Sequence, residues 1–531
     1  MEGQQESQVG KLGIVFWVSV CFSVVFLLWG AIFTGSLSDV TAAILNFVLN
    51  NFGWLYLVAT TLFLVFVIYL AFSRFGSVKL GKDDEEPEFG RLSWFAMLFA
   101  AGMGIGLVFW GVAEPMSHYG TPPYDMAQAG TPDAAELGLR YAFFHWGLHP
   151  WAVYAVIALC LAYFNFRRQQ GGIISSIFRP LLGDRVDGPI GNVIDVLAIV
   201  ATLFGVAVSL GLGALQVNGG LNFLFDVPNT ATAQIIIIAI IFVFYMTSAA
   251  TGIDKGIRYL SNLNMVLALL LVTFIFVVGP TALIIGSLVQ VAGSYTASLV
   301  PMSFEQNVFA EGTWASDWTL FYWATWIAWC PFVGTFIARI SRGRTIREFV
   351  IVVLLVPTVV SMFWFSSFGA AGIHADRQTG GEITSAVSEN VTNALFITFE
   401  QYPLAIVTSL IAMALVSVFF ITSADSASFV LGSMSTGGAL NPRVAVKFTW
   451  GFIIAAFAAV VLLAGGLDAL QKVAIIAAVP FAVIMIAMCL SLYVGLSQEE
   501  APEEVPGWVD DLRERLAENP EGRPASDPDD G

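Results

Sequence analysis

Apolar runs long enough to cross a bilayer recur along almost the whole chain. A membrane-spanning helix needs about 20 mostly apolar residues, and we predict twelve spans, near residues 12–34, 53–73, 93–115, 142–165, 192–224, 233–252, 258–279, 317–340, 347–372, 403–433, 444–466 and 474–496. The run at 233–252 contains consecutive isoleucines, as a buried strand can, but its length and lack of alternation favour a helix. Because hydrocarbon satisfies no backbone polar group, we expect an all-α integral membrane protein.

Three segments fall outside the predicted spans. Residues 1–11 form a short N-terminal segment, and residues 280–316 are expected to hold an amphipathic interfacial helix and a loop, because apolar positions there are interspersed with polar ones and no basic residues flank them. The tail 497–531 is rich in Glu, Asp and Pro. It predicts a short helix around Val509–Leu516 followed by disorder.

Composition supports the membrane assignment and excludes other classes. Charged residues make up 12% of the chain, about half the share in soluble domains. The formal net charge of -16 argues against nucleic-acid binding, which needs basic patches. Cys21, Cys160, Cys330 and Cys489 all fall inside apolar runs without a CxxC pair, so they are read as small hydrophobic residues and not as disulfides or metal ligands.

The basic residues predict the orientation through the positive-inside bias. With the N-terminus inside, sixteen of them fall in or beside inner loops: Arg74, Lys79, Lys82, Arg91, Arg167, Arg168, Arg179, Arg185, Lys255, Arg258, Arg339, Arg342, Arg344, Arg347, Arg443 and Lys447. Only three fall in outer loops: Arg140, Arg377 and Lys472. We therefore expect a multi-pass protein of the plasma (inner) membrane with both termini in the cytoplasm.

Glycines interrupt the third predicted span. Gly102, Gly104 and Gly106 occupy alternate positions, and each weakens a helix by about 1 kcal/mol. They allow either close helix packing or an unwound stretch whose amides and carbonyls line a site in mid-membrane. The residues alone leave both explanations open.

Aromatic residues gather in the fourth and eighth spans. Trp and Tyr commonly mark the membrane–water interface, which accounts for one or two of them. The full set is Trp146, Trp151, Tyr154, Trp323, Trp326 and Trp329. If the two spans face each other, these rings build a cage for a methylated ammonium through cation–π attraction. We favour this binding box over an aromatic belt.

Hydroxyl residues mark the tenth span. Thr422 and Ser423 are adjacent and offer two oxygens to a hard cation such as sodium, although hydroxyls in membrane helices often only bond the preceding turn. Asp425 is an acid within a span, for which we favour a structural role over a functional one. His145 and His149 have the spacing of a zinc pair, but no acid accompanies them in their span, so structural hydrogen bonding is the preferred interpretation.

With these motifs the sequence resembles the betaine–choline–carnitine transporter family, over about residues 12–496. The resemblance rests on Gly102–Leu107, Trp146–Trp151, Arg339–Glu348 and Thr422–Ser428. It implies twelve membrane helices, a homotrimer, and a LeuT-like core of two five-helix inverted repeats. The repeats map to residues 93–279 and 317–496, after two peripheral helices at 12–92.

The resemblance also implies site residues. The substrate's ammonium head maps to an aromatic box of Trp146, Trp151, Tyr154 and Trp326, with Trp329 nearby and Gly104 and Gly106 on the glycine-broken helix. One sodium site maps to Ala100, Met103, Phe419, Thr422 and Ser423. A second maps to Thr202 and Phe332, and is weakened because Val206 offers no side-chain oxygen where other members have a hydroxyl. No cofactor is implied beyond sodium as the coupling ion.

The expected function is therefore a sodium symporter that imports a zwitterionic quaternary-ammonium compatible solute, with glycine betaine as first choice. Choline, carnitine, ectoine and dimethylsulfoniopropionate remain alternatives on the same scaffold. Choline-preferring members tend to carry Asp where this chain has Gly106, and Thr325 stands where an additional Trp can occur. A channel or a membrane enzyme is a remote alternative, because neither filter rings nor a nucleophile with its base is evident.

Overall fold

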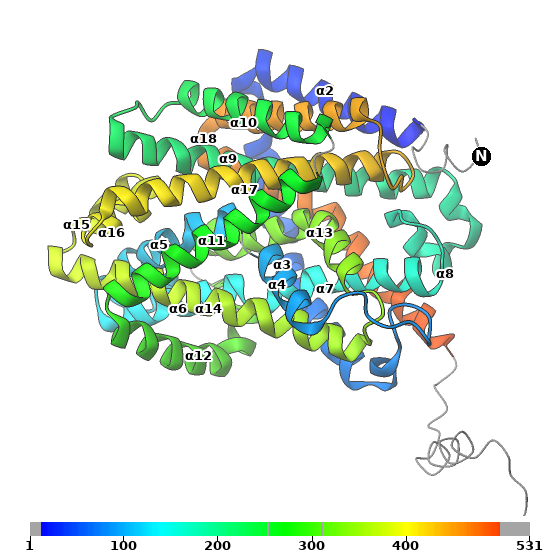
Figure 1. The fold of residues 1–531 in the computed structure, drawn as a ribbon, viewed down its shortest axis with the longest axis horizontal. Helices are drawn as coiled ribbons and strands as arrows, with labels where there is room; N and C mark the ends of the chain where they lie inside the picture. The colour runs from blue at the N-terminus through cyan, green and yellow to red at the C-terminus, as the bar shows by residue number, and fades with distance from the viewer. Residues whose placement is uncertain (1–11, 103, 252–253, 310–311, 500–531) are drawn as a thin grey trace, which may run out of the picture.

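The structure, a computed structural model, describes residues 12–102, 104–251, 254–309 and 312–499. Within these ranges it consists of helices and loops, with one isolated β-bridge between Lys79 and Thr345. Long helices run side by side, and α2 and α12 lie at opposite edges of the bundle (Figure 1). The α-helices are α2 (Ile14–Ile32), α3 (Thr34–Phe72), α4 (Arg91–Gly102), α5 (Ile105–Gly120), α6 (Pro132–Trp146), α7 (Leu148–Ala162), α8 (Arg179–Leu182), α9 (Pro189–Phe225), α10 (Ala231–Thr251), α11 (Asp254–Val278), α12 (Thr281–Phe304), α13 (Phe321–Ile340), α14 (Ile346–Thr379), α15 (Glu382–Glu389), α16 (Ala394–Glu400), α17 (Ala405–Ser435) and α18 (Val444–Ser497).

The predicted fold class is confirmed. Eleven described helical segments are long and apolar enough to cross a membrane. The last two predicted spans both lie in α18, which is bent where Gly465 and Gly466 leave helical geometry. The third predicted span is divided between α4 and α5, neither of which is long enough by itself. The arrangement fits a twelve-helix, LeuT-like core.

Two helices begin well before their predicted spans. α3 starts at Thr34 and not near residue 53, and α6 starts at Pro132 and not near residue 142. Thr131 caps α6 by accepting a hydrogen bond from the amide of Ala134 at 3.3 Å. The early turns carry polar residues, and a hydropathy pattern marks only the apolar part of a helix. The helices therefore extend beyond the predicted spans at these two starts.

The segment between the two halves is helical, as expected. α12 covers Thr281–Phe304 and packs against α6, α14 and α3. By length and composition it can also cross a membrane, so its interfacial placement stays a prediction. The segments 1–11 and 500–531, including the helix expected at Val509–Leu516, lie outside the described residues.

Two central helices position the site. α7 and α13 pack against each other, and both contact α3 and α18, while α13 also contacts α9. Nearly every residue of α7 is buried. Outer helices instead expose large apolar side chains, such as Phe72 on α3 and Val243 on α10. Contiguous exposed apolar surface of this kind faces lipid in a membrane protein.

The basic motif at 339–348 anchors the start of α4 and α14. Thr345 caps α14 by accepting a hydrogen bond from the amide of Glu348 at 3.2 Å. The Arg344 guanidinium pairs with Glu348 at 2.9 Å, lies 4.6 Å from the ring centre of Trp94 and donates to the carbonyl of Phe89. These contacts fix the beginning of α4, the first half of the third span, which is broken after Gly102.

Candidate functional site

The third span is broken at its glycines. α4 ends at Gly102, α5 begins at Ile105, and Gly104 between them is extended, with φ −149° and ψ −176°. A Cβ on Gly104 would meet open space, whereas a Cβ on Gly106 would come 2.9 Å from Cη2 of Trp146. Both explanations of the glycine motif therefore apply: the chain unwinds, and Gly106 permits close approach of an indole ring.

The fourth span contains a second break, which the sequence analysis missed. α6 ends at Trp146 and α7 begins directly after Gly147, whose φ and ψ are −96° and −130°. A Cβ on Gly147 would collide with the carbonyl oxygen of Phe143 and come 2.9 Å from the hydroxyl of Tyr295. The sequence signal was the glycine itself, standing three residues before Pro150.

One cavity is built from residues of α5, α6, α7, α9, α13 and α14. Its lining is mainly aromatic and apolar: Gly104, Ile105, Gly106, Leu107, Trp110, Trp146, Pro150, Trp151, Tyr154, Ser209, Leu212, Phe321, Tyr322, Thr325, Trp326, Trp329 and Ser361. All seven residues expected to bind substrate are among them: Gly104, Gly106, Trp146, Trp151, Tyr154, Trp326 and Trp329. The fold thus brings together side chains from two distant spans.

The rings around this cavity meet mostly edge to face. Trp146 and Trp326 have centroids 4.8 Å apart at 74°, and Trp151 and Tyr154 have centroids 5.5 Å apart at 77°. Tyr154 also meets Trp326 at 6.2 Å, and Tyr322 stacks on Trp326 at 6.0 Å. Rings packed at right angles present faces in several directions, which suits a rounded cationic head.

The three tryptophans of the eighth span do not share one face. Trp326 and Trp329 line the cavity, whereas Trp323 is fully buried and stacks on His149 at 5.2 Å. Each three-residue step advances about 300° around a helix of 3.6 residues per turn. The side chains therefore fan out across α13, and the expectation that Trp323 belongs to the cage was wrong.

Hydrogen bonds fix Trp326 and Trp329, the two tryptophans of α13 that line the cavity. Trp326 Nε1 donates to the carbonyl of His145 at 3.0 Å, and Trp329 Nε1 donates to the carbonyl of Gly205 at 2.6 Å. Thr325, where an additional Trp was weighed, lines the cavity and donates to the carbonyl of Phe321 at 2.8 Å. Its small side chain leaves that part of the cavity open.

The hydroxyl pair lies on α17. Thr422 donates to the carbonyls of Val418 at 3.0 Å and Phe419 at 3.2 Å, the local bonding that was weighed against an ion site. Its oxygen also accepts from Asn264 Nδ2 of α11 at 3.3 Å. Ser423 follows and is half-buried. The oxygen of Thr422 thus also accepts a hydrogen bond. A cation can bind this oxygen in place of the Asn264 amide.

The same part of α17 lies near the start of α5. Side-chain atoms of Ile105 and Phe420 each lie 3.0 Å from the position that a Cβ on Gly213 would take. The other expected ligands of the first sodium site come from the broken helix. Ala100 belongs to the last turn of α4, and Met103 lies outside the described residues.

The residues of the expected second sodium site are on α9 and α13. Thr202 is fully buried and donates to the carbonyl of Ala198 at 2.7 Å, and Val206 is buried one turn later. Phe332 lies 5.5 Å from Trp329, ring centre to ring centre. The buried valine supplies no side-chain oxygen, so this pair offers one hydroxyl.

The two histidines of the fourth span do not converge. His145 Nδ1 lies 2.7 Å from Glu114 and its Nε2 2.9 Å from the hydroxyl of Thr319. His149 Nε2 lies 3.0 Å from the hydroxyl of Ser303. The break at Gly147 separates them, and each has its own hydrogen-bond partner, as the structural interpretation expected.

Asp425 also has a local role. It accepts a hydrogen bond from the hydroxyl of Ser248 at 2.8 Å, and its own carbonyl accepts from Ser428 at 2.7 Å. Neither contact involves the cavity lining. The geometry supports the structural role expected for this acid.

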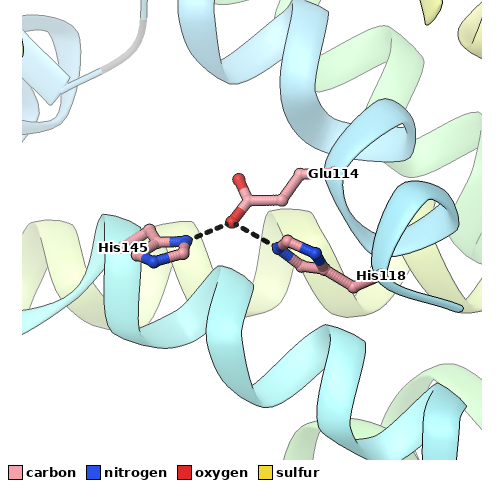
Figure 2. A group of neighbouring side chains, drawn as sticks. All are labelled: Glu114, His118 and His145. Atoms are coloured by element: carbon pink, nitrogen blue, oxygen red, sulfur yellow. Dashed lines mark hydrogen bonds and ion pairs between the residues drawn. The ribbon is translucent and has the colours of Figure 1, made fainter. Parts of the chain in front are cut away.

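The sequence analysis missed Glu114. This fully buried acid of α5 lies between His145 and His118, as Figure 2 shows, and also accepts from Trp146 Nε1 at 2.9 Å and from the hydroxyl of Tyr322. Trp146 and Tyr322 are cavity walls. The signal was available: an ionisable residue inside a predicted span marks a functional site by default.

Comparison with known proteins agrees with this geometry. Residues 14–501 match the family model described as BCCT, betaine/carnitine/choline family transporter. The chain is 51% identical to the glycine betaine transporter OpuD of Bacillus subtilis, over 91% of this chain and 94% of that protein. It is 41% identical to the ectoine/hydroxyectoine transporter of Virgibacillus pantothenticus, over 92% and 97%. It is 39% identical to the betaine/ectoine transporter LcoP of Corynebacterium glutamicum, over 93% and 80%.

These relatives are all named as transporters, and the match covers nearly the whole described chain. The helical bundle with its broken spans and its aromatic cavity is what such a transporter needs. The chain belongs to the betaine/carnitine/choline transporter family and is a multi-pass membrane transporter.

Proposed function

We propose that this transporter is a sodium-coupled symporter that imports glycine betaine. The observation that carries the proposal is the cavity wall of Trp146, Trp151, Tyr154 and Trp326, whose rings meet at steep angles. A trimethylammonium head gains up to about 2 kcal/mol from each desolvated aromatic face. The relative named as a glycine betaine transporter, at 51% identity, supports the same choice.

The other end of the ligand meets the broken helix. Gly104 lines the cavity, and open space surrounds the position where a Cβ would be. Amides freed by such a break, together with the positive end of the α5 dipole, attract a carboxylate. Choline has no carboxylate, so this end of the cavity favours a zwitterion.

Sodium coupling is proposed from the hydroxyls of Thr422 and Ser423. α17 packs against α5, the helix that follows the break. A cation bound between them would draw the broken helix and α17 together, and so link ion binding to the shape of the cavity. Thr202 is the hydroxyl proposed to bind a second sodium ion. This second site has fewer oxygen ligands, because Val206 offers no side-chain oxygen.

Ectoine is the second candidate substrate. Relatives named for ectoine transport are 41% and 39% identical to this chain. The small side chain of Thr325 leaves room beside Trp326, which the ring of a cyclic substrate would occupy. A cyclic zwitterion therefore fits the same chemistry of a delocalised cation and a carboxylate.

The test is uptake by the purified protein in proteoliposomes. Labelled glycine betaine, ectoine, carnitine, choline and dimethylsulfoniopropionate are compared with an inward sodium gradient and with potassium in its place. Saturable betaine uptake that requires the sodium gradient is expected. Uptake of choline alone, or uptake unaffected by sodium, would contradict the proposal.

The homotrimer and the cytoplasmic termini belong to the same proposal. They follow from the family resemblance and from the distribution of basic residues. Cross-linking in native membranes should give a trimer. Protease added to sealed right-side-out vesicles should leave the acidic tail uncut.

A further inference from the structure

Glu114 receives donors from two walls of the cavity. Its Oε2 accepts from Trp146 Nε1 at 2.9 Å and from the Tyr322 hydroxyl, and its Oε1 lies 2.7 Å from His145 Nδ1 and 3.6 Å from His118 Nε2 (Figure 2). Both oxygens are engaged, and the side chain is fully buried. The carboxylate is therefore held in one place directly behind the two rings.

This carboxylate has no strong cation to neutralise it. Among the residues that the structure describes, its ion-pair partners are the two histidines, and neither Lys nor Arg pairs with it. A neutral His145 with its proton on Nδ1 satisfies both of its contacts, because the Thr319 hydroxyl, 2.9 Å from Nε2, can donate to that nitrogen. A buried charge is costly unless something compensates it.

The compensating charge fits on the other side of the rings. Trp146 and Tyr322 point their N–H and O–H groups at the carboxylate while their rings line the cavity. A donor bonded to an anion becomes more polarised, and hydrogen-bonded groups reinforce one another in a low-dielectric interior. The ring faces then become more negative, which strengthens their attraction for a cation.

We propose that Glu114 is a positioning and charge-supplying residue of the substrate site. It holds Trp146 and Tyr322 in place and makes the cavity selective for a positively charged head over a neutral head of the same shape. The proposal rests on the function proposed above, because it concerns the ammonium group of that substrate.

A metal site is the competing explanation of the same cluster. Ligand atoms of Glu114, His118 and His145 lie within 4.8 Å of one another. However, the direct contact of 2.7 Å between Glu114 and His145 Nδ1 is a hydrogen bond, and the other nitrogen of His145 is engaged by Thr319. The second carboxylate oxygen is occupied by Trp146 and Tyr322. A metal would have to displace bonds that are already made.

The test compares two ligands of the same shape whose heads differ in charge. Glycine betaine and 3,3-dimethylbutyrate have the same shape, with a quaternary nitrogen in one and a quaternary carbon in the other. Each competes against labelled betaine for binding to the full-length purified protein. In Glu114→Gln, affinity for betaine should fall about tenfold, as for one lost cation–π face. Affinity for 3,3-dimethylbutyrate, whose head is uncharged, should change by less than about twofold, which is below half a kcal/mol.

Two further variants separate the role of Glu114 from loss of folding and from the loss of any buried acid. Tyr322→Phe retains the ring and removes one hydrogen bond, so the betaine preference should fall, though by less than in Glu114→Gln. Tyr322→Phe also tests the proposal if Glu114→Gln does not fold. Asp425→Asn removes another acid from a span, one that bonds to Ser248 away from the cavity, and should leave the preference at its wild-type value.

Each outcome has a distinct meaning. Wild-type protein that binds no betaine refutes the proposed function. Wild-type protein that binds betaine, with an unchanged ligand ratio in both Glu114→Gln and Tyr322→Phe, refutes the role of Glu114 alone. If treatment of the wild type with EDTA reproduces the ratio of Glu114→Gln, the cluster holds a metal and the role proposed here is overturned.

Discussion

Trp146 and Trp326 meet edge to face with ring centroids 4.8 Å apart, although they lie 180 residues apart in the chain. Trp326 is fixed by a hydrogen bond to the carbonyl of His145, the residue before Trp146. The two rings thus hold each other at the junction of α6 and α13. This junction forms the wall on which the proposed ammonium site depends.

Removing one ring should weaken binding without unfolding the protein. Trp326→Ala and Trp151→Ala should each reduce betaine affinity about tenfold, because each removes a cation–π face worth about 1–2 kcal/mol. Isothermal calorimetry in detergent gives the dissociation constants. Trp54→Ala is the matched control, since Trp54 is 53% exposed on α3 and does not line the cavity. Wild-type affinity in both cavity variants would rule out the aromatic box.

The sodium proposal is tested on the hydroxyl pair. Thr422→Ala/Ser423→Ala should raise the sodium concentration for half-maximal uptake at least about tenfold, since two oxygen ligands are lost. Uptake is measured in proteoliposomes over a range of sodium concentrations. The control is Thr408→Ala/Ser409→Ala, an adjacent hydroxyl pair on the same helix, both buried. Wild-type sodium dependence in Thr422→Ala/Ser423→Ala would exclude this site.

Selectivity between betaine and choline is tested at Gly106. Gly106→Asp should raise choline affinity relative to betaine, because an acid repels the carboxylate of betaine and attracts the uncompensated cation of choline. Any side chain at this position crowds Trp146, whose Cη2 lies 2.9 Å from the Cβ position. Gly106→Ala therefore serves as the steric control. It should weaken both ligands alike, and only the Asp variant should change their ratio.

Competition of betaine and choline against labelled betaine measures that ratio. An equal ratio in the Ala and Asp variants would make Gly106 a packing residue only. A wild type that already takes choline as well as betaine would remove the basis for the zwitterion preference.

The end of α18 predicts a stability that depends on pH. Burial alone would raise the pKa of Glu499, but hydrogen bonds from Arg167 at 2.8 Å and Tyr163 at 2.8 Å outweigh it, and the pKa lies below its ordinary value. A lowered carboxyl pKa contributes stability above the ordinary value of about 4.3, and this contribution is lost as pH falls through the lowered pKa.

The melting temperature in detergent should therefore fall between pH 6 and pH 3 by more in the wild type than in Glu499→Gln. Glu389→Gln, an exposed carboxylate at the end of α15, is the control and should retain the wild-type pH dependence. Parallel curves for the wild type and Glu499→Gln would show that the contact with Arg167 adds no stability.

The pattern of apolar residues was sufficient to predict the class of the protein and most of its helices. Apolar runs of about 20 residues have few alternatives in a bilayer, so hydropathy predicts spans such as α9, α10 and α17 closely. The glycines at 102–106 indicated a break in the third span as one of two explanations, because alternate glycines weaken a helix strongly. Motif resemblance supplied the aromatic residues, since their types and spacing are local features.

Which side chains meet depends on the packing of the helices and could not be predicted from local patterns. Trp323 has the same local pattern as Trp326, yet the packing of α13 directs it to His149 and away from the cavity. Glu114 belongs to the site because α5, α6 and α13 bring Trp146 and Tyr322 to its carboxylate from distant parts of the chain. Contacts of this kind depend on how helices pack side by side, and hydropathy carries no information about that arrangement.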